Sequence, residues 1–325
     1  MKIFVYNLRE YDEKAYFDEF CHTYGCTYAA TAAAPTLENA SLATGYDAIN
    51  ILTTKMDEPL LARFDALGVR FVATRTIGYD HIDVAAAHRM GMRVMRISYS
   101  PSSVANYTIM LMLMACRNIV QILERARLQD FSLRGKIGRE LSQCTVGVIG
   151  TGAIGATVIR HLSGFGCRLL AYDPAPDAAE GLAKRVPLEG LLAESDIITL
   201  HVPALESTYH MIDDAAIGHM KDGVILVNTA RGTLVDTAAL IRGLNSGKIG
   251  FAALDVLEHE RELMYRNRMN QVIGNHDLAV LNSYPNVIVS PHTAFYTQEA
   301  VSNMVENSIR GLMAFEAGQE NPFEV

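Results

Sequence analysis

The chain has few of the features that mark secreted, membrane-spanning or nucleic-acid-binding proteins. Its 325 residues include five cysteines, an odd number with no CxxC pair, so neither a disulfide framework nor a zinc ribbon is expected. It has no run of basic residues, and its net charge of −8 argues against nucleic acid and anionic membranes as partners. The longest apolar run, residues 104–116, is broken by Asn106 and Thr108 and is too short to span a bilayer. Because the N-terminal residues also lack a signal-peptide pattern, we expect a cytoplasmic protein.

What is present indicates a globular α/β protein. Half of the residues are apolar and 20% are charged, and the length suggests about two domains. Short apolar runs alternate with helical stretches, which is typical of parallel sheets. In the N-terminal part the predicted strands are 3–7, 47–52 and 70–74. From Cys144 onward they are 145–150, 168–173, 196–203, 224–230, 251–257 and 286–292. Their continuous apolar character predicts a sheet covered on both faces.

Two long helices are predicted outside this alternation. Residues 102–123 follow the break at Ser100-Pro101 and are almost wholly apolar at first, so we expect one long, largely buried helix there. Residues 297–317 carry apolar side chains at helical spacing. The many Met and Leu residues of the first helix are interpreted as core.

The sharpest local motif is a glycine-rich turn between a strand and a helix. Gly150, Gly152 and Gly155 follow the strand TVGVI in the spacing GxGxxG, which in this context predicts a dinucleotide site. Asp173 ends the next strand, where a carboxylate accepts from ribose hydroxyls and repels a 2′-phosphate, so NAD is favoured over NADP. The alternatives are a turn that binds nothing, or one that binds FAD or another nucleotide.

Three charged or titratable residues follow later strands. Arg231, Glu260 and His292 stand at ends of predicted strands, which line the ligand crevice of a doubly wound sheet. Singly, each is more often an ordinary surface or structural residue. Together they suit hydride-transfer chemistry: Arg presents a planar fork to a carboxylate, His exchanges the proton of a carbonyl/alcohol pair, and the Glu carboxylate favours the imidazolium.

Seven segments carry a resemblance to a known family. They are TRTIGYDHID (74–83), YSPSSVANYT (99–108), VGVIGTGAIG (146–155), LHVP (200–203), VNTARGTLVD (227–236), ALDVLEHE (253–260) and SPHTAFYT (290–297). With these the chain resembles the D-2-hydroxyacid dehydrogenases over essentially its whole length, nearest to the D-lactate dehydrogenases and their vancomycin-resistance relatives.

The resemblance implies a fold and a domain division. The fold is α/β, with two doubly wound parallel-sheet (Rossmann-like) domains and a cleft between them. Residues 1–100 with 298–325 would form the substrate domain, and residues 101–297 the NAD-binding domain. The latter is often also the interface of a homodimer in this family.

The resemblance also implies roles for individual residues. Arg231, Glu260 and His292 would be catalytic, with His292 as proton donor; Glu258 lies nearby, but the motif matches the second Glu of LEHE. Backbone N–H groups around Ile77, Gly78 and Tyr79 would hold the substrate carboxylate. The expected cofactor contacts, besides the three glycines, are Ala153, Ile154, Asp173, Val202, Pro203, Thr208, Thr229, Ala230 and Asp255. Thr208 and Asn106 replace Asn and Glu of other members.

The implied reaction is reversible hydride transfer between NADH and pyruvate, giving D-lactate; the D configuration rests on the resemblance alone. Tyr99 and Phe295 flank the expected cleft and predict a small substrate pocket, unless they and Tyr296 only pack the domains. One alternative is a bulkier acid such as 2-oxoisocaproate or phenylpyruvate. Others are a phosphorylated acid held by Lys55 or Arg75, and a non-catalytic NAD-sensing scaffold.

Overall fold

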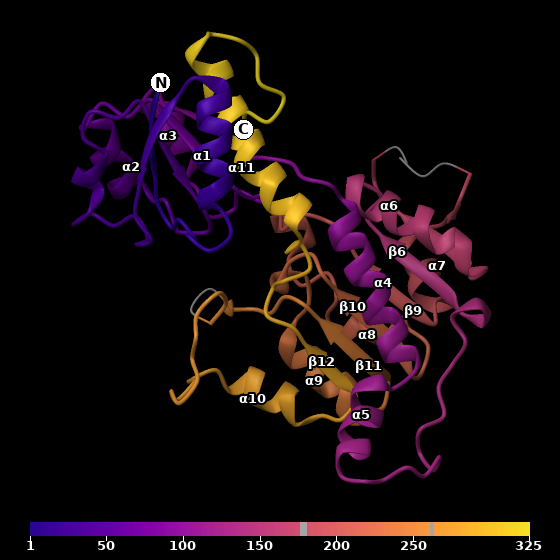
Figure 1. The fold of residues 1–325 in the computed structure, drawn as a ribbon. Coiled ribbons are helices and arrows are strands. Elements are labelled where there is room, and N and C mark those ends of the chain that lie inside the picture. The colour runs from indigo at the N-terminus through magenta and orange to yellow at the C-terminus, as the bar shows by residue number, and fades with distance from the viewer. Residues whose placement is uncertain (176–180, 261–262) are drawn as a thin grey trace. The chain divides into compact units, whose positions relative to one another are not determined.

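The structure is a computed structural model that describes residues 1–175, 181–260 and 263–325. The chain forms two compact units, Met1–Ser100 with Tyr296–Val325 (unit 1) and Pro101–Phe295 (unit 2) (Figure 1). The chain returns to unit 1 at Tyr296, two residues before the predicted boundary at 298. In the described part of the chain no single helix is long and apolar enough to cross a membrane. The bent pair α4 (Ser102–Cys116) and α5 (Ile119–Arg127) meets the same criteria of length and composition when the two helices are taken together.

Unit 1 is built on a five-stranded sheet in the order β2-β1-β3-β4-β5, and all of its described strand pairs are parallel. The strands are β1 (Lys2–Val5), β2 (Thr27–Ala30), β3 (Ala48–Ile51), β4 (Phe71–Thr74) and β5 (Arg93–Met95). The helices are α1 (Lys14–Tyr24), α2 (Glu58–Asp65), α3 (Val84–Arg89) and α11 (Gln298–Glu316). The last helix, from the far end of the chain, packs beside α1 and against β4 (Figure 1). A helix from the end of the chain therefore packs against the sheet that the first hundred residues form.

Unit 2 is built on a seven-stranded parallel sheet in the order β12-β11-β10-β9-β6-β7-β8. The strands are β6 (Thr145–Ile149), β7 (Arg168–Tyr172), β8 (Lys184–Arg185), β9 (Ile197–Leu200), β10 (Val224–Asn228), β11 (Ile249–Leu254) and β12 (Val287–Val289). The helices are α4 (Ser102–Cys116), α5 (Ile119–Arg127), α6 (Ala153–Leu162), α7 (Leu188–Glu194), α8 (Asp214–His219), α9 (Thr237–Ser246) and α10 (His276–Ser283).

Helices cover both faces of the larger sheet, so its strands are buried on both sides. Along β10, Ile225 and Val227 belong to the core beneath α4 and α6. Val224 and Leu226, which alternate with them, belong to a second core beneath α7, α8 and α9. This confirms the predicted doubly wound sheet. The strand order reverses between β6 and β9, and the crevice at such a reversal is where open α/β sheets bind ligands.

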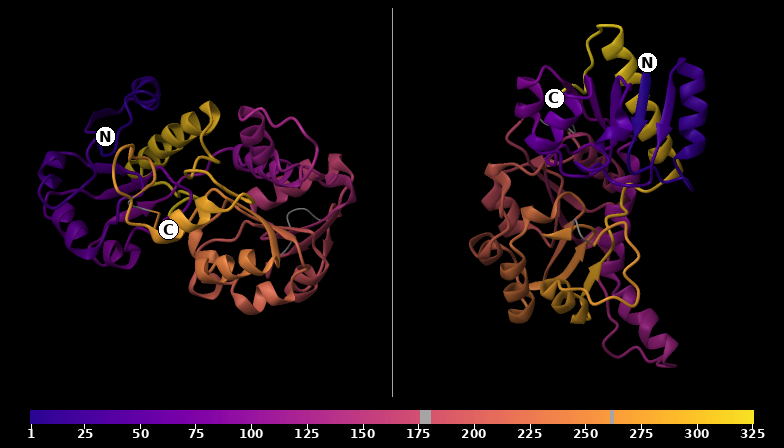
Figure 2. Two further views of the ribbon diagram at one scale, coloured as in Figure 1. Left: turned by 90° about the horizontal axis from the view of Figure 1, so that it is seen from below. Right: turned by 90° about the vertical axis from the view of Figure 1, so that its left-hand side faces the viewer.

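The predicted helix over residues 102–123 is wrong in its second half. Asn118 adopts a left-handed conformation (φ 50°) and separates α4, which has a buried face, from α5, which has no buried residue. α5 and the chain after it project from the rest of unit 2 (Figure 2). The apolar run is therefore a core helix only as far as Cys116. The helix predicted over 297–317 is confirmed as α11.

Candidate active site

The glycine turn joins β6 to α6 at the reversal point of the sheet. Gly150 has a φ of +94°, and an added Cβ would lie 2.6 Å from the carbonyl oxygen of His201. A Cβ on Gly155 would lie 1.9 Å from the carbonyl oxygen of Gly150, so only glycine lets the helix pack this closely.

Gly152 is different, because a Cβ there would meet nothing within 4 Å. The space in front of it is open, and no side chain caps the N-terminus of α6, which begins with Ala153 and Ile154. Backbone N–H groups at an uncapped helix start bind phosphate, so this open cradle fits a dinucleotide pyrophosphate.

Asp173 directly follows β7, and its carboxylate lies against the glycine turn. Its Oδ2 accepts from the backbone N–H of Thr151 at 2.6 Å, and its Oδ1 accepts from the N–H of Ala175 at 2.9 Å. The guanidinium of Arg185 donates to the carbonyl oxygens of Asp173 and Ala175. The carboxylate is therefore fixed beside the turn, where the predicted ribose contact requires it.

The remaining predicted cofactor contacts lie on neighbouring turns of unit 2. Val202 and Pro203 follow β9; Thr229 and Ala230 follow β10. The Thr229 hydroxyl lies 2.8 Å from that of Thr108 on α4. The Thr208 hydroxyl donates to the Pro203 carbonyl oxygen at 2.7 Å and accepts from the Leu205 N–H at 2.9 Å. Thr208 thus shapes its own loop, and its cofactor contact stays a prediction.

Arg231 is half-buried in a tight turn after β10. Asn228 fixes this turn: its amide donates to the Arg231 carbonyl oxygen at 2.8 Å, and its side-chain oxygen accepts from the Ala230 N–H at 3.0 Å. A Cβ on the next residue, Gly232, would lie 2.0 Å from the carbonyl carbon of Leu257. The turn that carries Arg231 therefore packs backbone to backbone against the loop that leads to Glu260.

His292 and Glu260 form a hydrogen-bonded pair. The Nδ1 of His292 lies 2.6 Å from Oε1 of Glu260, and both side chains are mostly buried. The second carboxylate oxygen of Glu260 accepts from the backbone N–H of Leu257 at 2.7 Å. His292 itself has a φ of 54°, an uncommon conformation for a residue with a side chain. The structure thus holds the imidazole in one orientation, with Nδ1 occupied by a carboxylate.

Asp255 explains why the loop around His292 is ordered. Its fully buried carboxylate accepts from the Ser290 hydroxyl at 2.6 Å, the Thr293 N–H at 3.0 Å and the Ala294 N–H at 2.8 Å. Burial raises the pKa of Asp255, although these donors oppose the shift. Since its side-chain hydrogen bonds go to residues 290–294, Asp255 anchors the His292 loop; its predicted cofactor contact stays untested.

Glu258 does not contact His292 in the structure. Its carboxylate lies 2.7 Å from Nε2 of His210 and accepts from the Thr237 hydroxyl at 2.6 Å. Burial favours a raised pKa for Glu258, but the donors on Thr237 and His210 outweigh it, and the pKa is lowered. The structure therefore brings Glu260 to the imidazole and turns Glu258 away from it.

In unit 1, the loop after β4 contains Ile77, Gly78 and Tyr79. Its shape is fixed by the hydroxyl of Thr76, which donates to the Gly78 carbonyl oxygen at 2.7 Å. No hydrogen bond among the described residues occupies the backbone N–H groups of residues 77, 78 and 79. Backbone N–H groups without a partner in the protein are available to an anion, so the predicted carboxylate contact at these residues stays a prediction.

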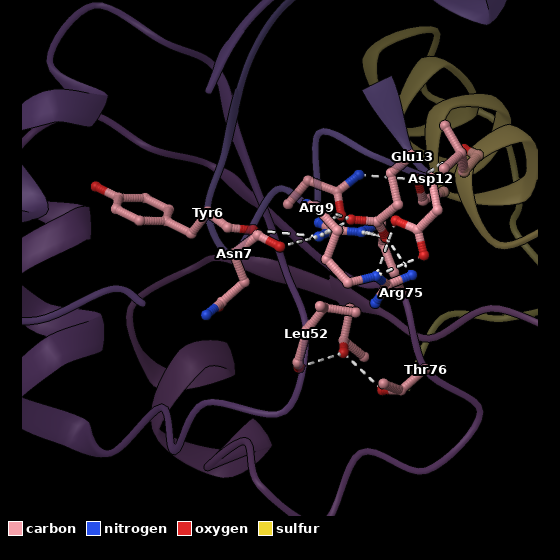
Figure 3. Close-up of polar contacts among 12 residues, drawn as sticks. Tyr6, Asn7, Arg9, Asp12, Glu13, Leu52, Arg75 and Thr76 are labelled. Atoms are coloured by element: carbon pink, nitrogen blue, oxygen red, sulfur yellow. Dashed lines mark hydrogen bonds and ion pairs between the residues drawn. The ribbon is translucent and has the colours of Figure 1, made fainter. Parts of the chain in front are cut away.

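Arg75 precedes this loop but does not face a ligand. It is fully buried and pairs with the buried Glu13 at 3.0 Å, and it donates to Asn50 and to the carbonyl oxygen of Tyr6 (Figure 3). Arg9 contacts the same carboxylate oxygen of Glu13, at 3.3 Å (Figure 3). The hypothesis that Arg75 binds a substrate phosphate is therefore wrong: its charge is needed to neutralise a buried glutamate and to tie strand ends together.

The aromatic residues predicted to line the substrate pocket, Tyr99 and Phe295, belong to different units. Phe295 belongs to unit 2, where its ring lies edge-on to His292 with centroids 6.5 Å apart. Tyr99 is half-buried in unit 1. The hydroxyl of Tyr296 donates to Asp12 at 2.6 Å, a bond that raises the pKa of Tyr296 to about 12. Tyr296 is thus hydrogen-bonded within unit 1.

Sequence reasoning missed Tyr265. Its hydroxyl donates to the His292 carbonyl oxygen at 3.2 Å, and its ring lies edge-on to Phe295 at 6.3 Å. Tyr265 lies in an irregular loop whose sequence has no periodic pattern, so no signal pointed to it. His210 and Thr237, the partners of Glu258, were missed as well because only the fold brings them together.

Comparison with known proteins places the chain in a family. The model for "D-isomer specific 2-hydroxyacid dehydrogenase, NAD binding domain" matches residues 109–294. The D-specific alpha-keto acid dehydrogenase of Enterococcus faecalis is 45% identical, with 86% of each chain covered. The aromatic 2-oxoacid reductase of Clostridium sporogenes is 43% identical over 97% of this chain and 96% of that one. The D-lactate dehydrogenase of Escherichia coli is 37% identical over the whole of both.

Solved structures agree with these relatives. A D-lactate dehydrogenase from Treponema pallidum superposes with a TM-score of 0.90 at 33% identity, covering 100% of this chain and 99% of that one. A D-2-hydroxyisocaproate dehydrogenase gives the same TM-score and coverage at 36% identity. The family model spans more than half of the chain and the relatives span most of it, so the chain belongs to the D-isomer specific 2-hydroxyacid dehydrogenases and is an NAD-dependent enzyme of that family.

Proposed function

We propose that this enzyme is a D-lactate dehydrogenase that reduces pyruvate to D-lactate with NADH and runs the reverse reaction. The observation that carries the proposal is the His292–Glu260 pair at 2.6 Å, in which the loop that carries Glu260 packs on the Arg231 turn. NADH, when bound at the glycine turn, supplies the hydride. The chain's own residues supply the rest: they bind the carboxylate, orient the ketone and deliver a proton.

Each catalytic residue has one role in this proposal. The guanidinium of Arg231 grips the substrate carboxylate and polarises the ketone oxygen. The protonated imidazole of His292 gives its Nε2 proton to that oxygen, while Glu260 on Nδ1 balances the positive charge. The backbone N–H groups of Ile77, Gly78 and Tyr79 form a second carboxylate anchor in unit 1.

The preference for pyruvate rests on the aromatic side chains that we assign to the substrate pocket, Phe295 and Tyr99. A small pocket disfavours larger acids, though an apolar pocket separates substrates that differ by one methylene by only about 1–3 kcal/mol. The alternative is a bulkier 2-oxo acid, favoured by the 43% identity to an aromatic 2-oxoacid reductase. Phosphorylated acids are disfavoured, because Arg75 is buried and Lys55 is an exposed side chain 4.0 Å from Asp57.

The test is a panel of 2-oxo acids ranked by kcat/KM with NADH. We expect pyruvate to lead phenylpyruvate and 2-oxoisocaproate, and Phe295→Ala or Tyr99→Ala to move the ratio toward the larger acids. A wild-type enzyme that prefers phenylpyruvate would refute the small pocket and leave the Arg231, Glu260 and His292 chemistry in place. An enzyme that binds NADH but turns over no 2-oxo acid would be a sensing scaffold instead.

We also propose a homodimer, formed through α4, α5 and the projecting segment. Ile109, Leu113, Ile122 and Phe165 line a groove of about 590 Å³ on unit 2. The segment after α5 exposes 78% or more of Leu128, Phe131, Leu133 and Ile137, a large apolar surface that a second copy would cover. Light scattering should give twice the chain mass, and the pair Phe131→Glu and Leu133→Glu should give the single mass.

Finally, we propose that the enzyme works in the cytoplasm. All five cysteines carry free thiols, four of them buried, which suits a reducing compartment. Fractionation of the source cells, with the activity followed through the soluble and membrane fractions, tests this point.

A further inference from the structure

A second histidine–glutamate pair lies in unit 2, and its glutamate, Glu258, is two residues before Glu260 in the sequence. Nε2 of His210 lies 2.7 Å from Oε1 of Glu258, and both side chains are mostly buried. The other carboxylate oxygen of Glu258 accepts from both the N–H (3.0 Å) and the hydroxyl (2.6 Å) of Thr237. The ring of Tyr209 stacks on His210 with 3.9 Å between centroids.

These contacts join three separate segments. Glu258 is on the loop after β11, Thr237 begins α9, and His210 is on the long connection between β9 and α8. The backbone N–H of His210 donates to the carbonyl oxygen of Thr233 at 2.9 Å, which places His210 alongside the turn that carries Arg231. The carboxylate of Glu258 thus connects the loop that carries Glu260 with the segments on either side of the Arg231 turn. We call the contacts of Glu258 with His210 and Thr237 the clamp.

The clamp lies beside a very close backbone contact between Gly232 and the peptide that joins Leu257 to Glu258. The peptide between Leu257 and Glu258 lies directly against Gly232, and the N–H of Leu257 is the donor that fixes Glu260. A small displacement of this peptide therefore moves the carboxylate behind His292 and the guanidinium of Arg231 relative to each other.

We propose that His210 and Glu258 form a positioning pair: they hold Arg231 and Glu260 in the mutual geometry that reduction of the 2-oxo acid requires. The inference rests on the proposed function, since it assumes the roles given above to Arg231 and Glu260. Neither His210 nor Glu258 touches the reacting atoms; both act through the peptide at Leu257. Misplacement of about 1 Å at a catalytic site costs about 100-fold in rate, so a modest loosening has a large effect.

The test compares His210→Ala, Glu258→Ala, their combination and the conservative His210→Gln, whose side-chain amide replaces the Nε2 donor. A matched control is Asp214→Ala, which breaks an exposed ion pair with Arg242 between α8 and α9 of the same unit. We expect each alanine variant to lower kcat/KM for pyruvate about 10–100-fold. The double variant should be no worse than the worse single one, because both remove the same clamp. His210→Gln should recover most of the loss, and Asp214→Ala should match wild type.

Two further readouts separate positioning from a general loss of structure. The Kd of NADH, measured by fluorescence, should stay unchanged, while the Kd of oxamate, a pyruvate analogue that does not react, should rise with the KM of pyruvate. The pH profile of reduction should move to lower pH, because the carboxylate of Glu260 shifts away from the imidazolium of His292 and stabilises its positive charge less. Among the described residues, the carboxylate of Asp255 and the ring of Tyr265 also lie near His292, and both are left intact.

Three outcomes would overturn the inference. Wild-type kcat/KM in both alanine variants would show that the pair positions nothing. A parallel loss of NADH and oxamate binding, with a lowered melting temperature and an unmoved pH profile, would assign the pair to general stability. Absence of turnover in the wild-type enzyme would overturn the proposed function and this inference with it, whereas wild-type turnover with unaffected variants overturns the inference alone.

Discussion

The backbone contact between Gly232 and Leu257 allows a quantitative prediction for Gly232→Ala. The new methyl group would lie 2.0 Å from the carbonyl carbon of Leu257, 2.1 Å from its oxygen and 2.5 Å from the nitrogen of Glu258. Ordinary contact begins at 3.4 Å, so this peptide must retreat by about 1.4 Å. Because all three atoms belong to the backbone, no side-chain rotation relieves the clash. The loop that carries Glu260 must then shift away from Arg231.

A shift of this size predicts a loss of about 100-fold in kcat/KM for the 2-oxo acid, since about 1 Å of misplacement suffices for that effect. Overpacking should also lower the free energy of unfolding by about 1–3 kcal/mol. The control is Gly218→Ala in α8, where a methyl group meets nothing within 4 Å; it should keep wild-type activity and gain up to about 1 kcal/mol of stability.

The assay follows NADH absorbance during pyruvate reduction, together with NADH binding by fluorescence and thermal unfolding. NADH binding should survive in Gly232→Ala, because the glycine turn at Gly150–Gly155 is untouched. A Gly232→Ala enzyme with wild-type kcat/KM would refute the reasoning, since it would show that the two segments need not touch for catalysis.

Three further predictions concern the anchors of substrate, cofactor and fold. Arg231→Lys should raise the KM for pyruvate strongly, because Lys keeps the charge but loses the bidentate fork; unchanged kinetics would place the carboxylate elsewhere. Asp173→Ala should narrow the preference for NADH over NADPH, measured as a ratio of kcat/KM values, and a wild-type enzyme that already prefers NADPH would contradict the reading of Asp173. Glu13→Gln should destabilise unit 1 by about 3–5 kcal/mol in denaturant unfolding, because it leaves the buried charge of Arg75 uncompensated; a loss below about 1 kcal/mol, as expected for an exposed pair, would contradict this.

The sequence predicted what local pattern encodes. Most strands of unit 2, the glycine turn and the final helix are each encoded in consecutive residues, as periodicity or as a motif. β2, β5 and β8 were not predicted: β2 has no buried residue, and β5 and β8 are only three and two residues long. The break at Asn118 was missed for a related reason: a left-handed residue interrupts the helix without a glycine or proline to announce it.

The residues of the site also fall into those that the sequence predicts and those that only the fold brings together. The residues at strand ends were predicted because topology alone brings them to one edge of the sheet. Which glutamate meets His292 depends on the path of the loop after β11, and only the resemblance to a family favoured Glu260 over Glu258. Contacts between distant segments, such as those of His210 with Glu258 and of Tyr265 with His292, have no local signature. The burial of Arg75 could not be read from its neighbours either, since its partner Glu13 lies 62 residues away.

The most direct test of the central claim, that the imidazole of His292 exchanges the substrate proton, is the pH dependence of kcat in both directions. The rates should be measured under conditions in which a kinetic isotope effect with deuterated NADH shows that hydride transfer limits the rate. Reduction of pyruvate needs the protonated ring, so its rate should fall as the pH rises, whereas oxidation of D-lactate needs the neutral ring and should rise. His292→Ala should abolish both dependences and lower kcat by about 10²–10⁴-fold while NADH still binds. Identical profiles in the two directions, or a His292→Ala enzyme with wild-type kcat, would contradict the account.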